Sequence, residues 1–174
     1  MRHVRARARF DFGFKIRNYE SSTRERVIEV NSSSIRPVVR LRVGNYGDAA
    51  ASSVLLNVLV PVSVQGLRWC GPNGEELASS KAGPPVSADD DLHDHMGTPV
   101  PAQHLVAEWP RVARKGGAVF FFCFTLPLPR TGAEVRVPIS AVAQADEIPD
   151  EVEEYEGSFE VRARRLSDTG DPTG

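Results

Sequence analysis

The stretch VVRLRVGNYGDAAASSVLLNVLVP, residues 38–61, decides the fold because it places a turn between two alternating segments. Between positions 39 and 43, aliphatic residues alternate with Arg40 and Arg42, which is the period of a β-strand. The Asn-Tyr-Gly-Asp sequence that follows is typical of a turn, and residues 53–64 resume the alternation with a row of aliphatic side chains. This stretch therefore predicts two strands, each with one side buried.

The same period extends toward the N-terminus. In residues 4–16 the even positions are apolar and the odd positions are mostly charged, so the segment predicts a strand with an aromatic inner side and an arginine-rich outer side. Residues 35–43 form the next alternating strand, and we expect the short apolar piece at 27–30 to pair beside it. The arginines predicted to face outward on these two long strands are Arg5, Arg7, Arg9, Arg36, Arg40 and Arg42.

Toward the C-terminus, alternation predicts further strands at 67–70, 103–112, 118–126, 135–141 and 159–163. The strand at 118–126 contains four phenylalanines and is apolar on both sides, which predicts a central place in its sheet. Nowhere does an apolar stripe of helical period continue over three turns. The sequence therefore predicts an all-β protein, an antiparallel two-sheet immunoglobulin-like β-sandwich of about eight or nine strands.

The expected domain organisation follows from where the alternation stops. We expect one β-sandwich domain over residues 1–166, with a long irregular loop at 78–101 and a disordered tail at 167–174. The acidic segment 146–156 offers little apolar surface and reads as a solvated loop.

Residues 38–61 resemble bacterial cell-adhesion-related (CARDB-like) immunoglobulin-fold domains, in which a strand ending in Asn-x-Gly is followed by small residues and a second apolar strand. The resemblance implies that Asn45 and Gly47 hold the corner between the sheets, with the Asn45 side chain capping the turn. Two further motifs are similar to that family, the Lys-Gly-Gly turn before the phenylalanine-rich strand and Gly157 before the last strand. The resemblance implies a spacer or interaction module and transfers no catalytic residues.

Composition limits the classes of partner. The formal net charge of −2 gives no overall basis for binding a polyanion, so we expect no specific nucleic-acid partner. No apolar run reaches about 18 residues, so we expect no membrane insertion. The first residues show no secretory signal, which predicts a cytoplasmic protein by default, or an extracellular one if this chain is a piece of an exported protein. Cys70 and Cys123 are interpreted as two buried thiols, although a sandwich could also bring them together as a pair.

One cluster has the residue types of a metal site. The candidate ligands are His93, His95 and His104, with several aspartates nearby, and a His-x-His pair on a strand directs both imidazoles to one side. The surrounding polar loop favours ordinary solvated histidines instead, so we expect no metal and no cofactor.

No nucleophile elbow, phosphate-binding glycine loop or nucleotide fingerprint is present, so we expect no enzyme. The outward arginines are the candidate partner-binding residues, unless they are ordinary solvent-facing charges paired with Glu25, Glu29 or the acidic segment near Glu153. The predicted function is a non-catalytic protein-interaction or structural spacer module. Its partner is expected to be another protein or a neighbouring domain of a longer chain, and the sequence leaves the oligomeric state open.

The alternative function is an accessory domain that binds carbohydrate or an anionic ligand, because Trp69 and Trp109 could stack on sugars beside the arginines.

Overall fold

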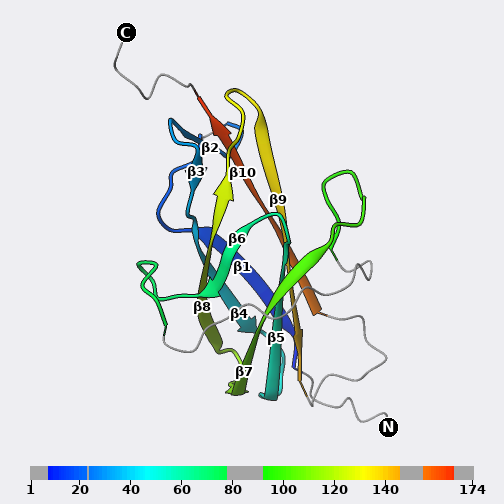
Figure 1. The fold of residues 1–174 in the computed structure, drawn as a ribbon. Helices are drawn as coiled ribbons and strands as arrows, with labels where there is room; N and C mark the ends of the chain where they lie inside the picture. The colour runs from blue at the N-terminus through cyan, green and yellow to red at the C-terminus, as the bar shows by residue number, and fades with distance from the viewer. Residues whose placement is uncertain (1–7, 23, 78–91, 146–154, 167–174) are drawn as a thin grey trace.

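The computed structural model describes residues 8–22, 24–77, 92–145 and 155–166. These residues form ten β-strands in two sheets (Figure 1). The described part of the chain contains no helix, and hence none that is long and apolar enough to cross a membrane.

The first sheet has the order β1-β4-β8, with β3 and β6 also paired to β8. Its strands are β1 (Phe10–Ile16), β3 (Ser34–Ile35), β4 (Val38–Asn45), β6 (Gln65–Trp69) and β8 (Gly117–Pro127). The second sheet has the order β2-β10-β9-β5-β7. Its strands are β2 (Val27–Val30), β5 (Ala51–Pro61), β7 (Ala102–Val112), β9 (Glu134–Gln144) and β10 (Tyr155–Arg165). The pairings of these strands are antiparallel except that of β2 with β10.

The predicted all-β, two-sheet fold is confirmed, and so is the central position of β8 between β4 and β6. The strand count rises to ten because Arg36 and Pro37 interrupt the predicted strand at 35–43, and its first part remains as β3. Proline cannot donate to the ladder, so a break at this point has a direct cause. The expectation that residues 27–30 pair beside this strand is wrong, because β2 pairs with β10 in the other sheet.

The core lies between the inner sides of the two sheets, as in other sandwiches. Its largest fully buried side chains come from both sheets and include Leu41, Leu56, Leu105, Phe122, Phe124 and Ile139. Residues at alternate positions supply most of these side chains, which is why the period of two was sufficient to predict the buried side of the alternating strands.

Aromatic side chains close the two open sides of the sandwich. On one side Phe14 of β1 stacks on Phe159 of β10, with ring centroids 5.3 Å apart. On the other side Trp69 packs against Phe120, and its indole Nε1 donates a 3.1 Å hydrogen bond to the carbonyl of Val106 in β7. Both sheets are thus tied along their edges, and their outer sides remain as the broad surfaces of the molecule.

Candidate interaction surface

The register of β1 against β4 places the two predicted arginine-bearing sides on one surface. Lys15 lies opposite Arg40, and Gly13 lies opposite Arg42. Residues two apart on a strand share a side, so basic side chains follow one another along the outer side of the first sheet. We call this surface the basic stripe, and it consists of Arg9, Lys15, Arg17, Arg40 and Arg42.

Arg42 lies flat on the sheet because two glycines leave room for it. Gly44 and Gly117 are cross-strand partners between β4 and β8. A Cβ atom on Gly117 would lie 2.9 Å from Nη2 of Arg42, and one on Gly44 would lie 2.7 Å from its Nη1. The guanidinium of Arg42, joined at Gly44 by the Asp11 carboxylate, therefore covers the space that two ordinary side chains would fill, while Arg42 as a whole stays exposed.

The other end of the basic stripe rests on an aromatic ring. The guanidinium carbon of Arg17 lies 5.5 Å from the ring centroid of Phe121, a cation–π geometry. Phe121 is also the cross-strand partner of Arg40. The stripe thus combines exposed guanidinium groups with an outward-facing phenylalanine on the central strand.

The basic side chains of the stripe form no ion pair in the described part of the chain. Asp11 is on the same outer side, opposite Gly44, and its carboxylate shares the space above Gly44 with the Arg42 guanidinium, although the two form no ion pair. These positive charges are therefore available to a group outside the described residues.

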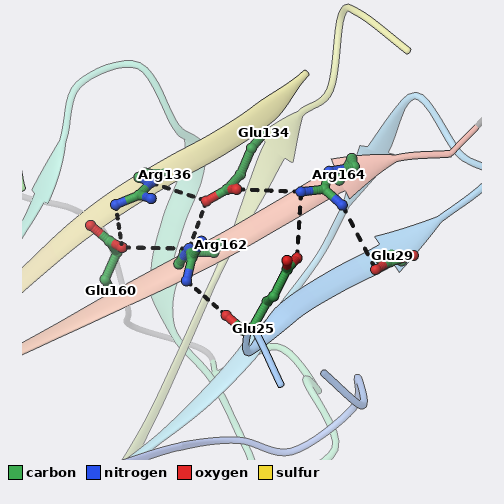
Figure 2. Close-up of polar contacts among 7 residues, drawn as sticks. All are labelled: Glu25, Glu29, Glu134, Arg136, Glu160, Arg162 and Arg164. Carbon is green, nitrogen blue, oxygen red and sulfur yellow. Dashed lines mark hydrogen bonds and ion pairs between the residues drawn. The ribbon is translucent and has the colours of Figure 1, made fainter. Parts of the chain in front are cut away.

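The outer side of the second sheet shows the opposite arrangement (Figure 2). Arginines and glutamates from β9, β10, β2 and the turn before β2 form one connected network there, namely Glu25, Glu29, Glu134, Arg136, Glu160, Arg162 and Arg164. Glu134 is its centre, since one of its oxygens lies 2.6 Å from Nε of Arg162 and 3.0 Å from Nε of Arg136. Arg162 also donates a 2.7 Å hydrogen bond to the carbonyl of Glu25.

The ion pairs at the centre of the network shift the pKa values of Glu134 and Arg162. The hydrogen bond from Arg162 and the charges of Arg162 and Arg136 lower the pKa of Glu134 below its usual value. The same hydrogen bond raises the pKa of Arg162. Glu25 and Glu29, which the sequence offered as partners for the stripe arginines, pair instead with Arg164.

The predicted site residues are only partly brought together. Arg9, Arg40 and Arg42 lie on the basic stripe, while Arg5 and Arg7 lie outside the described residues. Arg36 is exposed at the break between β3 and β4, where its backbone N–H donates to the hydroxyl of Tyr19. Glu153 also lies outside the described residues.

An apolar groove beside the stripe was not predicted from the sequence. It has a volume of about 630 Å³ and is lined by Trp69, Leu77, Val106, Trp109 and Val119, among others. Four of these side chains, all but Trp69, are 41–45% exposed. Val119 links the groove to the stripe, because it is the cross-strand partner of Arg42. The sequence predicted that the strand containing Val119 is apolar on both sides, but not which residues of β7 lie near it.

The histidines do not gather into a metal centre within the described residues, where no group of three or more suitable ligands occurs. His93 and His95 are exposed on the segment before β7, whereas His104 lies within β7 opposite Leu59. Asp94 is occupied by its own turn, since its Oδ1 accepts hydrogen bonds from the backbone N–H groups of Met96 and Thr98, and these bonds lower its pKa. The neighbouring aspartates at 89–91 lie outside the described residues.

No family model and no curated protein matches the sequence. Among solved structures, the chain is similar to the CARDB domain of the PF1109 protein from Pyrococcus furiosus, crystallised with di-metal ions. The two are 13% identical, the match covers 94% of this chain and 99% of that one, and the TM-score is 0.46. A solution structure of the same domain is 14% identical, with 90% and 96% coverage and a TM-score of 0.39.

AvmM, described as catalysing macrocyclisation in alchivemycin A biosynthesis, is 12% identical, with 91% and 89% coverage and a TM-score of 0.39. Structures of CARDB domains are thus among the folds to which this chain is similar, as its sequence motifs predicted.

Proposed function

We propose that this chain is a non-catalytic protein-interaction module and that its basic stripe contacts an acidic surface of another protein or of a neighbouring domain. One observation carries the proposal: arginines on the second sheet are paired with glutamates, whereas Arg40 and Arg42 form no ion pair in the described part of the chain. An exposed guanidinium that lies flat on a sheet is well suited to a carboxylate, which it binds through two parallel hydrogen bonds.

The apolar groove supports the same partner chemistry. Val119 offers exposed apolar surface directly beside Arg42, and Trp109 lines the same groove. Tryptophan and arginine are the residue types that most often dominate binding energy at protein interfaces. A partner segment with carboxylates next to an apolar side chain would contact the stripe and the groove together.

The test is affinity capture with the immobilised full chain, comparing wild type with the double variant Arg40→Glu, Arg42→Glu. The matched control is Arg24→Glu, Arg130→Glu, which makes the same charge change at two exposed arginines outside the stripe. We expect a partner that the control retains and the stripe variant loses. For that purified partner, the stripe variant should associate at least about tenfold more slowly at low salt and show a flatter salt dependence.

Equal capture by both variants would remove the basic stripe from the proposal, and capture of no partner by wild type would favour a structural spacer instead. Turnover of a substrate in a broad hydrolase screen, abolished by a single substitution in a groove, would show an enzyme.

The carbohydrate alternative has less support from the positions of the tryptophans. Trp69 packs against Phe120 and Phe122, and its Nε1 donates a hydrogen bond to the carbonyl of Val106. Its ring therefore serves the packing between the strands. Trp109 remains 42% exposed. Quenching of its fluorescence by soluble polysaccharides, absent in Trp109→Phe, would favour this alternative.

A further inference from the structure

Cys70 and Cys123 are far apart in the sequence but become neighbours on the first sheet. Arg68 of β6 is the cross-strand partner of Cys123 in β8, and the backbone N–H of Cys70 donates a 2.9 Å hydrogen bond to the carbonyl of Phe121. Cys70 is therefore placed opposite Phe121, two residues from Cys123. Because side chains two apart share one side of a strand, the two thiols are diagonal neighbours on the outer side of the sheet.

The thiols lie in a small apolar cluster that is separate from the main core. Cys70 and Cys123 are 3% and 4% exposed and pack with Val38 and Phe121. The turn at 71–76 covers this cluster, since Gly74 lies directly against the side chain of Val38. Both cysteines are free thiols in this structure.

The contact between the two thiols makes them chemically different. A hydrogen bond from Cys70 lowers the pKa of Cys123 to about 7, and the charge of Arg68 acts in the same direction. The same hydrogen bond, together with burial, raises the pKa of Cys70. The thiolate is the form that attacks disulfides, so Cys123 is the nucleophile of the pair and Cys70 the second thiol beside it.

We propose that Cys70 and Cys123 form a thiol–disulfide exchange site for low-molecular-weight disulfides of the glutathione type. The Cys123 thiolate attacks one sulfur of the small disulfide, forms a mixed disulfide and releases one small thiolate. Cys70 then loses its proton to solvent and attacks the Cys123 sulfur, which releases the second small thiolate. The two cysteines are oxidised to a disulfide and the small disulfide is reduced to two thiols.

The product would link Cys70, directly after β6, to Cys123 in β8 beside Phe121, on the same side of the sheet as the basic stripe. It would also close the chain between residues 70 and 123 into a loop. Closing a loop of this length restricts the unfolded chain, so the oxidised protein should melt at a temperature higher by roughly 5–10 °C, provided the geometry relaxes without strain.

The test equilibrates the folded full chain with mixtures of reduced and oxidised glutathione, blocks the remaining thiols by alkylation, and maps the peptides by mass spectrometry. We expect an intramolecular link between Cys70 and Cys123, a higher melting temperature that returns to its starting value with reductant, and an oxidation rate that rises with pH around a midpoint near 7. Cys70→Ala should react more slowly than wild type, because the hydrogen bond that lowers the pKa of Cys123 is lost, and it should stop at the mixed disulfide on Cys123, because the second thiol is missing.

Cys123→Ala should also react slowly, because burial still raises the pKa of the remaining thiol, and it should form no intramolecular link. The proposal is overturned if both thiols of the folded chain stay free in excess oxidised glutathione while the denatured chain reacts. It is also overturned if the links are intermolecular, or if the linked protein melts below the reduced one. Alanine at each position keeps the site apolar, and the melting curve of each reduced variant shows that it has folded.

Discussion

At the scale of single residues, Asn45 is the clearest case of a side chain that organises the backbone around it. It is 1% exposed. Its Oδ1 accepts hydrogen bonds from the N–H groups of Arg9 and Gly47, at 3.2 and 3.1 Å. Its Nδ2 donates to the carbonyls of Ala49 and Val112, at 2.8 and 3.3 Å. Since Val112 ends β7, this one amide connects the two sheets.

Replacing Asn45 with alanine should therefore lower the free energy of unfolding by about 2–4 kcal/mol, because it leaves several buried backbone groups without a partner. Urea denaturation measures the loss. Asn45→Asp is the matched control, since it keeps the shape and the acceptor oxygen but sets a carboxylate against two carbonyl oxygens, and it should also destabilise. A loss below about 1 kcal/mol for the alanine variant would show that water replaces these hydrogen bonds.

The role of Asn45 was predictable because its turn is formed by residues close in sequence. The Asn-x-Gly motif predicts both the side chain that caps the turn and the tight backbone that follows it. The position of the Arg42 side chain over two glycines was not predictable. It requires Gly44 and Gly117 to be cross-strand partners, and the sequence of one strand does not determine its register against a distant strand. The outward direction of Arg42 could be predicted, but its flat conformation beside Asp11 and its lack of an ion pair could not.

At the scale of strands, the long alternating segments were predictable, and the partner of the short one was not. In each long alternating segment, the period of two predicts which side of the strand is buried. β2 has only four residues, and it pairs with a strand more than a hundred positions later in the chain. The register of that pairing places Glu29 opposite Arg164. The ion pair between them can therefore be predicted only when the alignment of the two strands is known.

The paired charges of β9 and β10 predict how stability depends on pH. The pKa of Glu134 is lowered in the folded state, so its contribution to stability is complete above the unfolded value of about 4.3 and is lost as the pH falls through the folded value. Glu134→Gln should lower stability at pH 7 by no more than about 1 kcal/mol, because its partners are partly exposed. It should also reduce the loss that wild type suffers between pH 5 and pH 3.

Urea unfolding at pH 7, 5 and 3 measures both effects. Glu108→Gln, at an exposed position of β7, is the control that removes one carboxylate away from the network. An acid loss as steep in the Glu134 variant as in wild type would assign the pH dependence to other carboxylates.

At the scale of the whole molecule, a formal net charge of −2 conceals two unlike surfaces. One sheet carries arginines that are paired with glutamates, and the other carries basic residues with no such partners in the part of the chain that the structure describes. Composition alone cannot separate these arrangements, because arginine and glutamate contribute to the total in the same way whether or not they touch.

The same substitution on the two surfaces should therefore have unequal effects. Arg42→Glu removes no ion pair and leaves an exposed side chain, so the free energy of unfolding should change by no more than about 0.5 kcal/mol. Arg162→Glu sets a new carboxylate beside Glu134 and Glu160 and removes the hydrogen bond to the carbonyl of Glu25, so it should lower the melting temperature clearly. Added salt should restore part of that second loss, because screening weakens repulsion between partly exposed carboxylates.

Thermal melts of both variants at low and high ionic strength measure the difference. If Arg42→Glu lost as much as Arg162→Glu, Arg42 would be a structural partner of Asp11 across the glycine pair. Asp11→Asn would then rescue the loss by removing the repulsion between two carboxylates. If only Arg162→Glu is destabilised, Arg42 has no structural partner whose loss unfolds the protein, and its charge can be reversed with the fold intact, as the proposed association experiment requires.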